Sequence, residues 1–187
     1  MIITVTGKPC SGKGTASKIF CSKYNFDYVC AGDIMRDIAA KKGYVNVLEF
    51  QQLDPNVKDV DKFIDGQIAD IGVKRIDDDL LIDSRLAWHF AKKSFKVFID
   101  VDLTTAGERL LNAHRENEST KNIDHAKQLL TNRWKTENDR YKEIYNVDNM
   151  HMENYDLIID STNLTPEQIA DIIYENYKKY LKNTKKS

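Results

Sequence analysis

The chain has 187 residues, with 28 Lys and Arg against 29 Asp and Glu, which gives a formal net charge of −1. This length suits one α/β domain with a full hydrophobic core and is short for two. The balanced charge argues against a nucleic-acid-binding protein, and no apolar run is long enough to cross a membrane. Three cysteines without metal-ligand spacing, Cys10, Cys21 and Cys30, fit a reducing compartment. We expect a cytoplasmic monomer without a nucleic-acid or membrane partner.

Strand and helix patterns alternate along the chain. Short apolar runs predict five strands, at residues 2–6, 28–30, 80–83, 95–101 and 157–160. Longer segments predict eight helices, at residues 14–24, 33–42, 47–52, 59–71, 84–93, 104–115, 123–144 and 165–182. Thr165, Pro166 and Gln168 are typical of the start of the last helix. The alternation predicts a three-layer α/β fold, with a five-stranded parallel sheet flanked by helices and ligands at the carboxyl ends of the strands.

The most specific motif follows the first predicted strand. It consists of Gly7, Lys8, Pro9, Cys10, Ser11, Gly12, Lys13, Gly14 and Thr15. This is a Walker A phosphate loop, whose glycines at Gly7 and Gly12 let backbone N–H groups turn inward toward a phosphate. Lys13 reaches the β- and γ-phosphates, and the helix that opens there adds the positive end of its dipole. The motif therefore predicts that the chain binds a nucleoside triphosphate.

Thr15 and Asp83 are the candidate magnesium ligands. Gly14 stands where the strict motif has Ser or Thr, so that Thr15 could cap the first helical turn, contact a phosphate or approach Mg²⁺. Asp83 ends the apolar run of the third predicted strand, where a Walker B acid would organise Mg²⁺ or its waters. The alternative role of Asp83 is to cap the helix expected to begin near Ser84.

Two arginines that follow predicted strands are candidates for binding the phosphate of an acceptor. Arg85 lies two positions beyond Asp83, and Arg36 lies one helical turn beyond Asp33. A guanidinium group can hold a phosphate through two parallel hydrogen bonds. We therefore place Asp33, Arg36 and Arg85 at the acceptor site, although a surface ion pair of Arg36 with Asp33 or Asp37 is an alternative.

Two further arginines, Arg133 and Arg140, lie on one predicted helix. They differ by seven positions, so they return to nearly the same helix face. Together they could hold an acceptor phosphate and the γ-phosphoryl group. The alternative is a solvated face on which both arginines pair locally with Glu137.

Two segments exceed what a minimal alternating fold needs. About 33–72 places three predicted helices between two strands, and about 114–122 is a polar stretch that contains Arg115. A second substrate needs a wall and a lid that closes over it, and a lid arginine can stabilise charge in the closed site. We expect a helical acceptor-binding insert and a lid within a single domain of residues 1–187, with surface elaboration as the alternative.

The phosphate loop is not the only segment that resembles a known family. The stretches 31–36, 48–50, 82–88, 139–145 and 155–166 also resemble short archaeal cytidylate kinases, within the nucleoside monophosphate kinase family of P-loop kinases. This resemblance implies transfer of the γ-phosphoryl group of ATP to CMP or dCMP with Mg²⁺. It also implies that Arg36 and Arg85 bind the acceptor phosphate. Lys13, Arg115, Arg133 and Arg140 would line the site of transfer.

Two other functions stay open at this point. A kinase on the same scaffold could act on AMP, UMP or a non-nucleotide acceptor, as in adenylate kinase-like enzymes. A regulatory P-loop ATPase would instead hydrolyse its nucleotide to change partners. The Asn-Lys-x-Asp segment that guanine-binding switches usually carry does not occur in the sequence.

Overall fold

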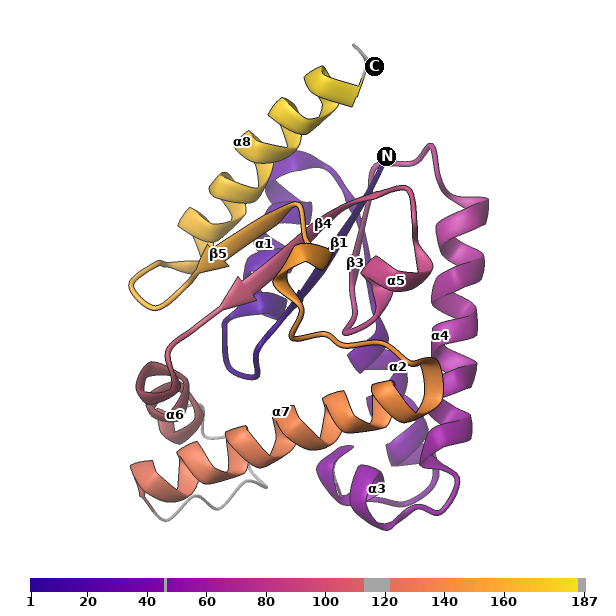
Figure 1. Ribbon diagram of the computed structural model, residues 1–187, viewed down its shortest axis with the longest axis vertical. Helices are drawn as coiled ribbons and strands as arrows, with labels where there is room; N and C mark the ends of the chain where they lie inside the picture. Colours follow the sequence, from indigo (N-terminus) through magenta and orange to yellow (C-terminus); the bar gives the residue numbers. More distant parts are fainter. Residues whose placement is uncertain (46, 113–121, 185–187) are drawn as a thin grey trace.

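The computed structural model describes residues 1–45, 47–112 and 122–184. Five parallel strands form one sheet in the order β2-β3-β1-β4-β5 (Figure 1). Their bounds are β1 Ile2–Gly7, β2 Asp27–Cys30, β3 Leu80–Asp83, β4 Ser94–Asp100 and β5 Leu157–Asp160. All five predicted strands are thus confirmed. The ends of β1, β3 and β4 meet at one edge, where Val5 pairs with Asp83 and Gly7 with Ile99.

Helices cover both faces of the sheet. They are α1 Lys13–Tyr24, α2 Ala31–Lys41, α3 Val47–Leu53, α4 Val57–Lys74, α5 Ala87–Phe90, α6 Leu103–Asn112, α7 Ile123–Tyr145 and α8 Pro166–Thr184, with a 3₁₀ helix at Met152–Asn154. Figure 1 shows α1 and α8 on one side of the sheet and α4 and α5 on the other, while α7 runs past the carboxyl ends of the strands. The three-layer α/β fold is confirmed. No helix of the described residues has both the length and the apolar character to cross a membrane.

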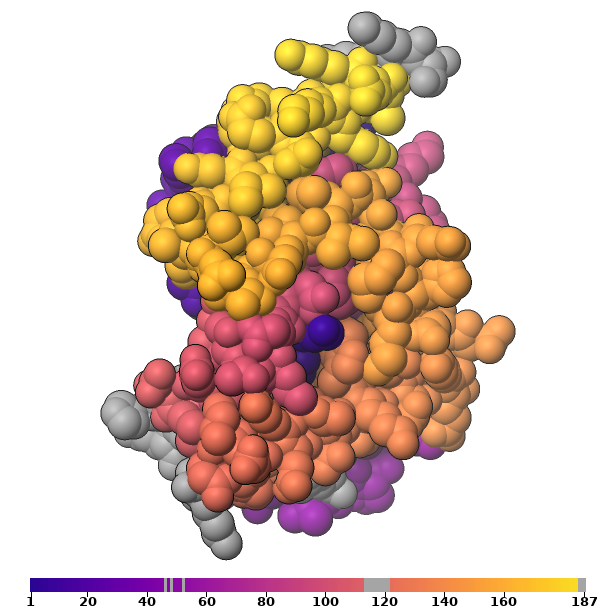
Figure 2. Space-filling view, turned by 60° about the vertical axis from the view of Figure 1, so that its left-hand side comes forward, coloured from indigo at the N-terminus to yellow at the C-terminus, as the bar shows by residue number. Residues whose placement is uncertain are grey.

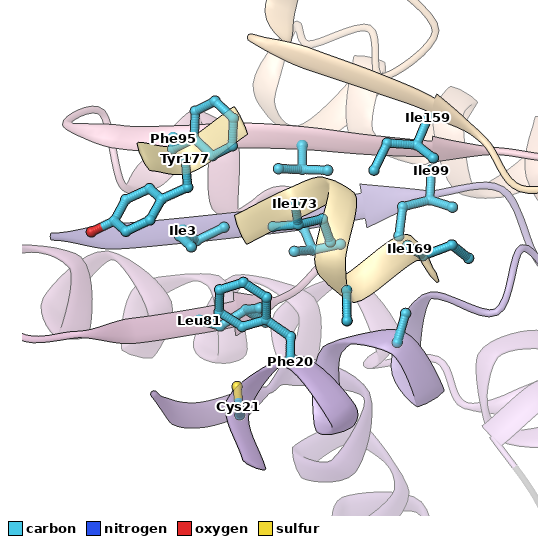
Figure 3. Close-up of a cluster of buried hydrophobic side chains, with 14 residues drawn as sticks. Ile3, Phe20, Cys21, Leu81, Phe95, Ile99, Ile159, Ile169, Ile173 and Tyr177 are labelled. Atoms are coloured by element: carbon cyan, nitrogen blue, oxygen red, sulfur yellow. The ribbon is translucent and has the colours of Figure 1, made fainter. Parts of the chain in front are cut away.

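Alternate strand residues divide the core into two apolar layers. Ile3, Leu81 and Ile99 point toward α1 and α8, where they pack around Phe20 and Ile173 (Figure 3). On the opposite face, the neighbouring residues of β1 and β3 pack against α2, α4 and α5, and Phe98 of β4 belongs to a separate apolar cluster with residues of α5 and α7. Because both faces are covered, the strands are nearly continuous apolar runs, which is why the sequence predicts them well.

One predicted helix is largely wrong. Residues 84–93 are helical only over Ala87–Phe90. The chain turns after Ala91, whose carbonyl oxygen accepts a hydrogen bond of 2.7 Å from the Ser94 hydroxyl. β4 begins at Ser94, directly after this turn. A helix that continued to residue 93 would leave no residues to form the turn. By contrast, the predicted start of α8 is confirmed by reciprocal hydrogen bonds between Thr165 and Gln168.

Gly7 ends β1 at a point where another backbone passes very close. A Cβ atom at this position would lie well inside van der Waals contact with the carbonyl oxygen of Ile99 on β4. The sequence predicted Gly7 for its conformational freedom, but its φ is not positive, and the close approach is what requires glycine here.

We predict that Gly7→Ala lowers the free energy of unfolding by about 3 kcal/mol, because the added methyl group must push two sheet strands apart. Urea denaturation would measure the change. Gly66 on α4 has no atom within 4 Å of the place where a Cβ would stand, so Gly66→Ala serves as the matched control. It should stabilise the protein by about 0.5–1 kcal/mol through helix propensity. Equal stability of the two variants would contradict this account of Gly7.

Candidate active site

The loop between β1 and α1 has the curled backbone that the motif predicts. Cys10 and Gly12 both adopt left-handed conformations, with φ of 60° and 81°. Gly12 is the N-cap of α1 and offers no side-chain capping group, so the first N–H groups of the helix are open to an anion. The capping role considered for Thr15 is not found in the described part of the chain; its exposed side chain lines the cleft described below.

Hydrogen bonds from Arg109 on α6 hold the phosphate loop in place. Its guanidinium group donates hydrogen bonds to the Ser161 carbonyl oxygen at 2.7 Å and to the Cys10 carbonyl oxygen at 3.4 Å. The buried Ser161 hydroxyl in turn donates to the Ser11 carbonyl oxygen at 2.9 Å. These bonds tie the loop to the segment between β5 and α8, so its N–H groups are held in place before any ligand arrives.

Lys13 and Asp83 form an ion pair at the carboxyl edge of the sheet. Asp83 is only 2% exposed, and the Tyr28 hydroxyl donates to its other oxygen at 3.2 Å. Burial, followed by the positive charge of Arg85, lowers the pKa of Lys13 to about 7. An anionic phosphate beside Lys13 would favour the charged ammonium group again. Asp83 does not cap a helix, because α5 begins only at Ala87 with Leu86 as its N-cap.

Glu137 on α7 holds two arginines together. Its carboxylate accepts hydrogen bonds from Arg85 Nε at 2.9 Å and from Arg133 Nε at 3.1 Å. Burial alone would raise the pKa of Glu137, but the charges of Arg85 and Arg133 outweigh it and the pKa lies below its ordinary value. Arg85 also donates to the Gly7 carbonyl oxygen, which fixes it beside the phosphate loop. The local pair of Arg133 with Glu137 is therefore present, but Glu137 is buried rather than solvated.

Two carboxylates of α4 lie opposite the last turns of α7. Asp61 forms an ion pair of 2.6 Å with Arg140 Nε, and Asp65 accepts a hydrogen bond of 2.7 Å from the Tyr145 hydroxyl. The exposed fractions are 5% for Asp61, 7% for Asp65 and 9% for Arg140. Burial raises the pKa of both aspartates to about 6. This arrangement joins the helical insert to α7.

Many of these groups line one cleft with a volume of about 970 Å³. Its lining includes loop residues 8–15 together with Arg36, Asp61, Asp65, Asp83, Arg85, Arg133 and Glu137. In Figure 2, indigo atoms from the N-terminal part of the chain are visible at the floor of a hollow beside the orange surface of α7. The cleft thus brings together the phosphate loop, the helical insert and α7, which are far apart in the sequence.

Asp33, Arg36 and Arg140 form ion pairs instead of facing the cleft together as predicted. Arg36 lines the cleft but forms an exposed ion pair with Asp33, as the alternative had it, and Asp33 is not part of the lining. Arg140 is buried in its pair with Asp61 and is also absent from the lining. Arg115 and residues 114–121 of the predicted lid lie outside the described residues.

The carboxylate of Asp83 fits the requirements of a magnesium site that is completed by a nucleotide. Mg²⁺ in such sites is held by one or two carboxylates together with phosphate oxygens and waters. Within residues 1–45, 47–112 and 122–184, no group of three or more His, Cys, Asp or Glu could hold a metal ion alone. A Cβ at Gly14 would lie 3.6 Å from Asp83 Oδ2, so the carboxylate faces the start of α1, near Thr15.

Sequence reasoning missed four residues: Asp61 and Asp65, which line the cleft, and Arg109 and Tyr145, which hydrogen-bond to residues that line it. One signal was available for the two aspartates. On α4 the buried residues are Asp61, Ile64, Asp65, Ile68 and Gly72, which share one helix face. Acids at core-facing positions of a helix are rarely buried without a partner, and such positions point to a site.

The fold and the cleft define a P-loop nucleotide-binding protein with the fold of small-molecule kinases. A family model described as an AAA domain matches residues 6–127. Among solved structures, shikimate kinase from Bacteroides thetaiotaomicron superposes with a TM-score of 0.67 at 14% identity, covering 95% of this chain and 98% of that one. At that identity the likeness concerns the fold alone.

Curated protein sequences identify the family more specifically than the solved structures do. A cytidylate kinase from Methanococcoides burtonii is 34% identical over 92% of this chain and 94% of its own length. A second cytidylate kinase, from Methanocaldococcus jannaschii, is 33% identical over 96% of this chain and 100% of its own length. The chain belongs to the cytidylate kinase family. It is also 34% identical to an S-adenosylmethionine-dependent nucleotide dehydratase from Lacinutrix mariniflava, but it spans only 36% of that protein.

We predict that Glu137→Gln lowers the free energy of unfolding at pH 7 by about 3 kcal/mol, because two partly buried guanidinium groups lose their buried counter-charge. The lowered pKa of Glu137 gives stability that is present above the ordinary pKa of 4.5 and is lost as the pH falls through the folded-state pKa. The difference between wild type and variant should therefore shrink in acid.

Urea denaturation at several pH values would measure this difference. Glu143→Gln on the same helix is the matched control, because Glu143 is exposed and pairs with Lys58 at the surface. It should change stability by less than about 1 kcal/mol. A Glu137→Gln variant as stable as this control would show that Glu137 does not hold the arginines.

Proposed function

We propose that this protein is a cytidylate kinase that transfers the γ-phosphoryl group of ATP to CMP or dCMP, giving ADP and the diphosphate. The observation that carries the proposal is the shared cleft, in which a phosphate loop faces the paired guanidinium groups of Arg85 and Arg133. The cytidylate kinase relatives that match over nearly the whole chain support the choice of acceptor. We also expect the enzyme to act as a monomer in the cytoplasm.

The proposed reaction needs little covalent chemistry from the protein. Phosphoryl transfer is catalysed mainly by positioning the two substrates and by neutralising the charge on the transferring group. The N–H groups of the loop and Lys13 would bind the triphosphate of ATP. Arg85 and Arg133, held by Glu137, would bind the phosphate of the acceptor and bring its oxygen in line. Arg36 would approach the same phosphate after leaving Asp33.

Asp83 and Thr15 are the residues that would hold Mg²⁺ together with ATP. The metal ion supplies charge neutralisation between the β- and γ-phosphates when it is bound. The release of Lys13 from its contact with Asp83 would accompany nucleotide binding, since both groups then have better-matched partners. Contacts of Arg115 and Arg140 with the transferring group stay predictions from the sequence.

A panel of nucleoside monophosphates with Mg-ATP and a coupled assay for ADP release tests the proposal. We expect CMP and dCMP to be phosphorylated with a kcat/KM at least about 10-fold above that of AMP and UMP. Turnover of AMP far above CMP would place the enzyme with the adenylate kinase-like alternatives. ADP release that does not depend on any acceptor would instead support the regulatory ATPase.

We predict that Arg85→Ala raises the KM for CMP by about 10- to 100-fold and leaves the KM for ATP within about 3-fold. The reason is the loss of a charge-assisted contact with the acceptor phosphate. Steady-state kinetics with each substrate varied in turn would measure both constants. Arg75→Ala is the matched control, because Arg75 pairs with Asp27 and Asp78 away from the cleft. An unchanged KM for CMP in Arg85→Ala would remove Arg85 from the acceptor site.

A further inference from the structure

The end of the cleft formed by the helical insert contains two acidic groups that phosphate binding does not explain. Asp61 and Asp65 line it together with Tyr44, Val47 and Ile64. Carboxylates repel phosphate groups, so these acids cannot serve the same purpose as the arginines of the cleft. Their neighbours are largely apolar, which suits a flat, uncharged part of a ligand.

The acids are held in fixed positions by α7. Arg140 Nε pairs with Asp61 at 2.6 Å, and the Tyr145 hydroxyl donates to Asp65 Oδ2 at 2.7 Å. Within the described part of the chain, no hydrogen bond reaches the other Asp65 oxygen, Oδ1. The Arg140 Nη2 atom is buried there without a hydrogen-bond partner. Among the described residues, Asp65 thus offers the cleft an unused acceptor.

The same helix carries the phosphate-binding end of the acceptor site. Arg133 and Glu137 lie on α7 ahead of Arg140, and seven helical residues rise by about 10 Å. Tyr145, the partner of Asp65, lies five residues further along α7 than Arg140. An acceptor whose phosphate lies between Arg85 and Arg133 would therefore extend its sugar and base toward Asp61 and Asp65. This order along α7 matches the order of the parts of a nucleotide.

Keeping these acids charged costs stability. Burial raises the pKa of Asp65 to about 6, so the group is mainly ionised at pH 7 although the folded state disfavours its charge. An uncharged side chain would suit the fold better at neutral pH. Acids that are kept in a cleft against such a cost are typical of functional sites.

We propose that Asp65 selects the base of the acceptor nucleotide by accepting a hydrogen bond from an exocyclic amino group through Oδ1. Asp61, held by Arg140 from outside the cleft, lines the neighbouring wall. Cytosine carries an amino group at position 4, whereas uracil carries a carbonyl oxygen there. The carboxylate would attract the first and repel the second, so that CMP is accepted and UMP is rejected. This inference rests on the proposed function and names its specificity-determining residue.

Asp65→Asn tests the inference. In the variant, the amide oxygen can still accept from Tyr145, so the amide nitrogen faces the cleft as a donor that suits uracil. We expect the ratio of kcat/KM for CMP to that for UMP to fall by about 100-fold or more, with the KM for ATP within about 3-fold of wild type. Asp59→Asn, an exposed position on the same helix, is the matched control and should leave the ratio unchanged.

Thermal unfolding at pH 7 separates recognition from a structural role. Removing a disfavoured buried charge should leave the melting temperature of Asp65→Asn equal to or above that of wild type. Tyr145→Phe is a second variant, which keeps the acid but loses the hydroxyl that orients it. We expect it to lower the CMP to UMP ratio by about 3- to 10-fold.

The outcomes distinguish this inference from the proposed function. A wild type that prefers CMP over UMP, together with a folded Asp65→Asn variant whose ratio changes by less than about 3-fold, would overturn the role of Asp65 and leave the function standing. A wild type that does not phosphorylate CMP would overturn the proposed function, and this inference with it.

Discussion

Lys13 and Asp83 meet at the carboxyl edge of the sheet because β1 and β3 pair in parallel with Val5 opposite Asp83. This register places the first turn of α1 beside a buried carboxylate, and the rest of the cleft is built outward from that contact. Arg85 follows two residues after Asp83 and reaches back to the carbonyl oxygen of Gly7. A shift of one residue between these strands would turn Asp83 to the opposite face and separate the acid from the phosphate loop.

Most of the buried charged side chains that the structure describes lie in or beside the cleft, while the stability of the fold comes from elsewhere. Two apolar layers sandwich the sheet and hold the strand ends rigidly. Buried ion pairs such as that of Arg140 with Asp61 add little to the free energy of folding, because desolvation offsets much of their attraction. Their main effect is to fix the positions of the side chains. The pairs keep guanidinium groups extended and correctly spaced before a substrate binds, which reduces the reorganisation that binding requires.

The sequence predicted what depends on local pattern and could not predict what depends on contacts between distant segments. The strands, the phosphate loop and the position of Asp83 follow from short runs and spacings. The burial of Glu137 could not be predicted in this way. Its helix face has the pattern of a solvated face, and its partner Arg85 lies 52 residues earlier in the chain. The pairing of Asp61 with Arg140 likewise joins α4 to α7 and has no local sign. The mispredicted helix after Asp83 failed because the need to return to β4 overrides its local helix propensity.

The most direct test of the central claim, that one cleft holds both phosphate groups, is the affinity of a bisubstrate compound in which adenosine and cytidine are joined through five phosphates. Isothermal titration calorimetry would compare its dissociation constant with that of ATP. We expect the compound to bind at least about 100-fold more tightly, since linking the two ligands makes the second contact intramolecular. An affinity no greater than that of ATP would contradict the account, because the two binding sites would then not lie in a common cleft.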